Sequence, residues 1–152
     1  MAAKGTVEQT VTRKGNMIRV RWYWTSDESG DVDENGTGSG EFWFNPSSIP
    51  LFLVGVNIIY LSATNGYDVY VKTHYGQDIL KGMGVGLADD AGDPGNMFCP
   101  VNTSQDIGTA TNAAGTPICI WDKSLEIVVD DAGNGAHGYV ELYFMLPSNR
   151  DM

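Results

Sequence analysis

The chain has 152 residues, of which 42% are hydrophobic, and its 19 acidic and 9 basic side chains give a formal net charge of −10. This hydrophobic share excludes a disordered tail, and the length predicts one domain over residues 1–152 that buries a sizeable core. The negative charge repels phosphate backbones and anionic lipid headgroups, so it argues against nucleic-acid and membrane partners.

The first residues, MAAKG, lead directly into polar, strand-like sequence without the apolar segment of a signal peptide. The longest apolar run, residues 49–61, is too short to span a membrane and is interrupted by proline, glycine and asparagine. We therefore expect synthesis in a cytoplasm. Residues 1–11 and 147–152 are a candidate extended arm and a candidate C-terminal tail.

Alternating apolar and polar residues predict β-strands along most of the chain. The alternation covers residues 18–24, 67–72, 125–130 and 139–146, and it places one residue set on each face of a sheet. No window of ten residues free of Gly and Pro carries a helical stripe. The sequence therefore predicts an all-β, single-domain antiparallel β-sandwich, of jelly-roll or immunoglobulin-like type, with long loops.

Turn residues separate these strands. Lys14-Gly15-Asn16 lies between the first two strand candidates, and residues 131–135 (DAGNG) join the last two. Asn65-Gly66 is the strongest short-range hairpin signal in the chain, because both residues tolerate positive φ. We therefore expect a hairpin at Asn65-Gly66.

The glycine-rich segment 81–87 (KGMGVGL) resembles a phosphate loop only in its glycines, since it lacks the Lys-Ser/Thr pair and a following helix. It predicts an edge strand or bulge at which another backbone approaches closely. Met83 and Val85 within it are candidate protein contacts. Downstream, a short strand at 97–101 is expected between long loops at 88–95 and 102–116.

The stretch from Asp27 to Phe42 contains the spacing D-x-D-x-N-G, beginning at Asp31 and ending at Gly36, which opens a calcium-loop signature. The twelfth position should be a bidentate Glu, but it is Phe42, and Glu41 comes one place early. The flanking residues are strand-like, whereas this loop normally joins two helices. The pattern favours a polar hairpin tip over a calcium site, so no metal ligands are assigned.

The sequence carries no recognisable catalytic constellation. His74 and His137 lie in no motif, and the acidic residues of the loops are adjacent in sequence, which does not place two carboxyls across a groove. Cys99 and Cys119 are expected as buried thiols, although one disulfide stays open. We therefore expect no enzyme activity, no catalytic residues and no cofactor.

Aromatic residues gather on two strand candidates. Trp22 and Trp24 share one face, and Tyr23 points to the other. Phe42, Trp43 and Phe44 follow the acidic loop. If Trp43 opposes Tyr23, a second aromatic face lies outside the core, where it contacts either a protein subunit or a sugar ring. The candidate contact residues on these strands are Tyr23, Phe42, Trp43 and Phe44.

Four segments together resemble small all-β capsid decoration or cement proteins of tailed bacteriophages. They are W-x-S-D-x-S-G at 24–30, Y-D-V at 67–69, the glycine-rich segment at 76–84, and the A-G-N turn at 132–134. The chain departs from this pattern around 42–45 and in the loops after Leu87.

The resemblance implies a non-enzymatic virion protein on the capsid surface, assembled in the host cytoplasm. Its expected partners are the major capsid protein and itself, as a homodimer or homotrimer. The alternative function is a carbohydrate-binding or host-adhesion module of a phage tail.

Overall fold

The computed structural model describes residues 5–32, 41–43, 51–63, 66–73, 76–87, 97–98, 101–102, 116–120 and 124–147. These residues form ten strands and no helix. The described part therefore contains no helix with the length and hydropathy that a membrane span requires. The strands are β1 (Thr6–Lys14), β2 (Met17–Thr25), β3 (Glu41–Trp43), β4 (Leu51–Ser62), β5 (Asp68–Thr73), β6 (Met97–Phe98), β7 (Val101–Asn102), β8 (Thr116–Ile120), β9 (Ser124–Asp130) and β10 (His137–Met145).

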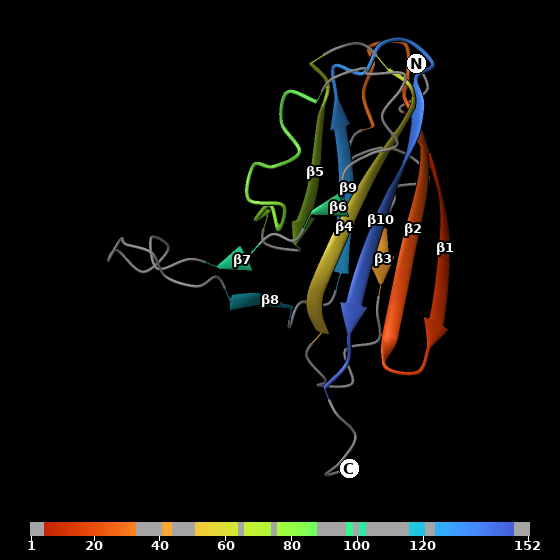
Figure 1. Cartoon of the computed structure of the whole chain (residues 1–152). Coiled ribbons are helices and arrows are strands. Elements are labelled where there is room, and N and C mark those ends of the chain that lie inside the picture. Colours follow the sequence, from red (N-terminus) through yellow and green to blue (C-terminus); the bar gives the residue numbers. More distant parts are fainter. Residues whose placement is uncertain are drawn as a thin grey trace.

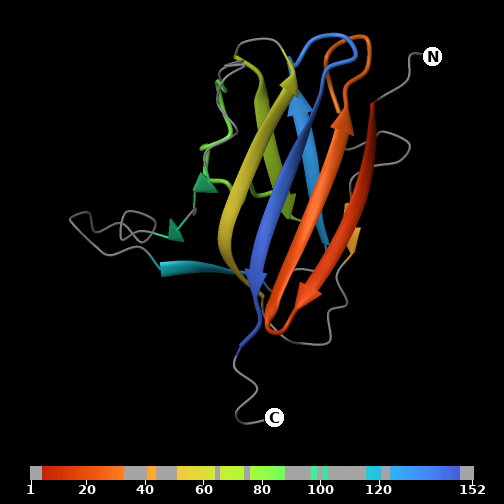
Figure 2. The same ribbon diagram turned by 45° about the vertical axis from the view of Figure 1, so that its right-hand side comes forward.

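Two antiparallel sheets pack face to face, which confirms the predicted all-β sandwich (Figures 1 and 2). The large sheet has the order β1-β2-β10-β4-β8-β7, with β6 also paired to β4, and the small sheet has the order β3-β9-β5. β1 and β2 form a hairpin, with its turn at the predicted Lys14-Gly15-Asn16. In both figures β7 and β8 extend sideways from the β4 side of the large sheet.

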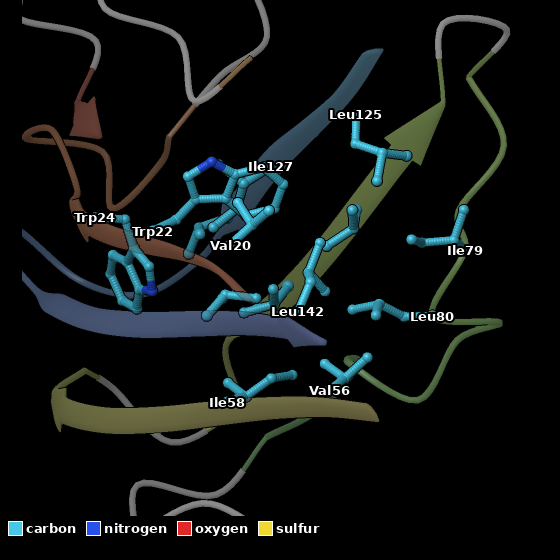
Figure 3. Packing of buried hydrophobic residues seen from close by; sticks show 14 of the residues in the cluster. Val20, Trp22, Trp24, Val56, Ile58, Ile79, Leu80, Leu125, Ile127 and Leu142 are labelled. Carbon is cyan, nitrogen blue, oxygen red and sulfur yellow. The ribbon is translucent and has the colours of Figure 1, made fainter. Parts of the chain in front are cut away.

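The core lies between the sheets and is built by the alternating residues that the sequence pattern identified. Figure 3 shows Val20, Trp22 and Leu142 of the large sheet near Leu125 and Ile127 of the small sheet. Four of these five side chains are fully buried, and Ile127 is 1% exposed. Trp22 also donates its indole N–H to Gln9 Oε1 at 2.9 Å, which satisfies its one polar group.

Two expected hairpins are wrong, because the strands on either side of each turn lie in different sheets. β4 belongs to the large sheet and β5 to the small sheet, so the segment around Asn65-Gly66 crosses between them. Gly66 instead donates its N–H to Leu87 O at 2.8 Å. β2 and β3 are likewise separated, and the acidic stretch between them is no hairpin tip.

Two boundaries also differ from expectation. Of the candidate arm at residues 1–11, residues 6–11 pair with β2 as the first part of β1. The strand expected at 97–101 consists of two short pieces, β6 and β7. Of the tail at 147–152, only Pro147 is described.

Candidate functional site

One end of the sandwich is closed by two segments that are distant in sequence, Ser26–Gly30 and Asp131–Ala136, here called the clasp. The buried Ser26 hydroxyl donates to Gly133 O at 2.6 Å and accepts from Ala136 N–H at 2.9 Å. Gly30 O accepts from Ala132 N–H at 2.9 Å. Figures 1 and 2 show both segments together at the end where β9 leads into β10. Two motifs of the phage resemblance thus meet each other in space.

Acidic residues in and next to the clasp bind backbone groups. Asp27 Oδ1 accepts from the N–H of Ser29 at 2.8 Å and of Asp31 at 3.0 Å. Asp31 Oδ1 accepts from Asp131 N–H at 3.1 Å. These bonds satisfy turn amides, which gives both carboxylates a structural role. Within the described residues no group of three metal-ligating side chains converges, and the motif positions 33–36 lie outside them.

The segment 76–87, here called the coil, is a series of turns, whereas an edge strand or bulge was expected for residues 81–87 (Figure 1, green, beside β5). Asp78 causes this difference, because its carboxylate accepts from the N–H groups of Val71 at 3.1 Å, Leu80 at 3.0 Å and Gly82 at 3.0 Å. Amides that would otherwise form a ladder or cradle a phosphate are thereby already bonded.

The coil is held closely against β5. Gly84 O accepts from Val69 N–H at 2.7 Å, and a Cβ atom at Gly84 would lie 2.1 Å from Val69 O. Only glycine fits here, so the predicted close backbone approach is confirmed. Leu80 is fully buried, whereas Met83 and Val85 are each 50% exposed. The coil therefore presents two apolar side chains from a fixed backbone.

The outward residues of the large sheet form rows across β1, β2, β10 and β4, here called the outer face. One row is Glu8, Tyr23, Tyr139 and Ile59, and the next is Thr10, Arg21, Glu141 and Asn57. Tyr23 is therefore opposed by Tyr139, with ring centroids 4.9 Å apart and planes tilted by 46°. The condition that Trp43 opposes Tyr23 is not met, since Trp43 pairs with Ser124 in the other sheet.

A buried carboxylate lies at the centre of the outer face. Glu141 is 6% exposed, and its Oε1 accepts from Asn57 Nδ2 at 3.1 Å. Its Oε2 lies 3.7 Å from Arg21 Nε and 3.8 Å from Arg19 Nη1. The guanidinium of Arg21 also lies over the Tyr139 ring, 3.9 Å from the centroid. Two contacts therefore fix the position of Arg21.

An open cleft of about 290 Å³ lies beside these groups on the outer face. Its walls contain two phenol rings, one guanidinium, one carboxylate and one aliphatic hydroxyl, so hydrogen-bond donors and acceptors are mixed. The lining residues are Glu8, Thr10, Arg21, Tyr23 and Tyr139.

The outer face of the small sheet differs in charge, because Asp68 of β5 is paired opposite Asp130 of β9. Burial raises the pKa of the Asp130 carboxyl, the Asp31 carboxylate adds to this rise, and Lys72 opposes it. Burial and the Asp68 carboxylate also raise the pKa of Tyr70. The paired acids here repel each other.

Of the candidate contact residues, Tyr23, Met83 and Val85 are described in full. Tyr23 lies on the large sheet, whereas Met83 and Val85 lie on the coil, which packs against β5 of the small sheet. Phe42 and Trp43 are placed only as backbone in β3, and Phe44, His74 and Cys99 lie outside the described residues. His137 lies beside Tyr23, with ring centroids 6.2 Å apart. Tyr139 and Glu141 were not predicted as site residues, although their outward position followed from the alternation.

A scan of protein-family profiles, a search of curated proteins and a search of solved structures found no significant match.

Proposed function

We propose that the protein is a non-enzymatic virion structural protein of the capsid decoration type, which binds between major capsid subunits and stabilises the head. The coil supports this proposal, because it presents Met83 and Val85, each 50% exposed, from a backbone anchored by Asp78 and Leu80. A fixed segment loses little conformational entropy on binding, so its exposed apolar side chains are effective contacts.

The phage resemblance supplies the virion setting, and the clasp shows that two of its motifs are joined by hydrogen bonds between Ser26 and the 133–136 turn. A decoration protein binds many equivalent positions on a symmetric shell. Self-association into a dimer or trimer increases the avidity of a contact that is weak alone. Each bound copy also stabilises the assembled shell by mass action.

Co-sedimentation of the purified chain with shells of the major capsid protein from the same genome tests the proposal. We expect the wild-type chain to bind shells, and Met83→Lys to lower the affinity about tenfold, as loss of an interface anchor does. Met145→Lys is the matched control, because Met145 is 43% exposed on β10, away from the coil. A wild-type chain that stays in the supernatant would contradict the proposal.

A further inference from the structure

We infer that the cleft on the outer face of β1, β2 and β10 binds one unit of a neutral saccharide. This inference concerns a different surface from the coil, so it holds or fails independently of binding to a capsid. It commits to one of the two occupants, sugar or protein, that the aromatic residues around Tyr23 suggested.

The size of the cleft favours a small ligand. Its volume is about 290 Å³, near the lower end of small-molecule pockets, which run from roughly 300 to 1,000 Å³. A protein partner would instead need a contact of about 800 Å² on each side. The concave surface therefore suits a single ring better than a subunit.

The chemistry of the walls matches a ring that is apolar on its faces and polar at its edge. The C–H groups of a pyranose face pack on aromatic rings. Tyr23 supplies one ring, and Tyr139, tilted by 46° to it, supplies a second ring whose one face is covered by the Arg21 guanidinium. Sugar hydroxyls both donate and accept hydrogen bonds. Glu8 accepts, Arg21 donates, and the Thr10 hydroxyl does both.

The charges of the cleft favour a neutral saccharide over an anionic one. Among the described residues that line the cleft, Arg21 is the only cation, and it is balanced by Glu8 in the lining and by Glu141 at 3.7 Å. The whole chain carries a net charge of −10, which repels an acidic ligand. Because Arg21 is fixed by Glu141 and Tyr139, its free donors are oriented before the ligand arrives.

A glycan array probed with the full chain, followed by NMR titration with the neutral oligosaccharides that bind, tests this inference. The array should include glucose, galactose, mannose and N-acetylglucosamine oligosaccharides. We expect amide shifts confined to the neighbourhood of Glu8, Thr10, Arg21, Tyr23 and Tyr139. Silence of the array, or shifts centred on another surface, would overturn the inference.

Single substitutions then test which side chains contribute to the affinity for the saccharide. Tyr139→Ala should lower the affinity about tenfold, which corresponds to roughly 1.4 kcal/mol and lies within the range of an aromatic contact. Tyr143→Ala is the matched control, because Tyr143 lies on the same strand and face but does not line the cleft, and it should leave the affinity within about twofold. A circular-dichroism spectrum and thermal melt of each variant verify its fold. Equal affinities of Tyr139→Ala and wild type would also overturn the inference.

Discussion

The two faces of the large sheet are built from the same strands but differ in almost every physical property. The inner face carries Val20, Trp22 and Trp24, which are fully buried against the small sheet. The outer face carries Arg21 and Tyr23, which alternate with these residues along β2. Arg21 is paired there with the Glu141 carboxylate, and both Arg21 and Tyr23 line the open cleft. Strand alternation thus allows one face to provide stability and leaves the other available for recognition.

The largest expected effect is on the inner face. Trp22→Ala removes a fully buried indole, so we expect the free energy of unfolding to fall by about 3–5 kcal/mol in a urea titration. Tyr23→Ala, one residue away on the outer face, should cost less than about 1 kcal/mol. Equal losses from both substitutions would mean that the faces do not differ in this way.

Gly138 tests whether the inner face tolerates added volume. A Cβ atom there would lie 2.7 Å from Ile59 O and 2.9 Å from the Trp24 ring. Gly138→Ala should therefore lower the unfolding free energy by about 2–3 kcal/mol, as overpacking does, measured by thermal unfolding. Val11→Ile adds a methylene at a position that is 47% exposed, and it serves as the control with no expected loss. The β10–β4 pairing shifts register between His137 and Gly138, and a tolerated Gly138→Ala would show that this irregularity adjusts freely.

Glu141 is the exception on the outer face, because it is buried there. Glu141→Ala leaves the Asn57 amide and two arginines without their carboxylate, so we expect a loss of about 1–2 kcal/mol in urea unfolding. The loss is moderate because both arginines are partly exposed and hydrated. Glu141→Gln retains an acceptor for Asn57 and should lose less. If both variants match wild type, the ion-pair network contributes no stability.

A substitution on the outer face of the small sheet should give the smallest change in the free energy of unfolding, and this change should depend on pH. Because the pKa of Asp130 is raised in the folded state, the folded chain binds a proton at this carboxylate more tightly than the unfolded chain does. Ionised Asp130 therefore costs stability above its folded pKa, and this cost disappears as the pH falls through that pKa toward the ordinary value of 3.8. Asp130→Asn should stabilise the protein at pH 7 by about 0.5 kcal/mol.

Unfolding of Asp130→Asn measured from pH 7 down to about pH 3 checks the sign, since its advantage over wild type should shrink with falling pH. Glu28→Gln removes one negative charge at an exposed position and controls for net charge. If the stabilisation by Asp130→Asn grew toward low pH, this would contradict the raised pKa of Asp130.

Much of the fold could be predicted because the alternation is regular. Val20, Trp22 and Trp24 were expected on one face, and all three are fully buried. The Lys14-Gly15-Asn16 turn was also predicted correctly, since its strands pair with each other. Such local patterns need no knowledge of distant partners.

The pairing of strands could not be predicted, because it depends on contacts far apart in sequence. Asn65-Gly66 has ideal hairpin chemistry, yet Gly66 bonds to Leu87 and the strands separate into two sheets. For the same reason the cross-strand partner of Tyr23 was not predicted, as Tyr139 lies more than one hundred positions away. The roles of Asp27, Asp31 and Asp78 as acceptors of backbone N–H groups were equally hidden, since the sequence does not show which amides lack partners.

The most direct test of the division between the two faces is a paired measurement on Tyr139→Ala, combining urea unfolding with calorimetric titration of a neutral oligosaccharide. We predict a stability loss below about 1 kcal/mol together with an affinity about tenfold weaker. A loss above about 3 kcal/mol, comparable to that of a core residue, with unchanged affinity would contradict the account.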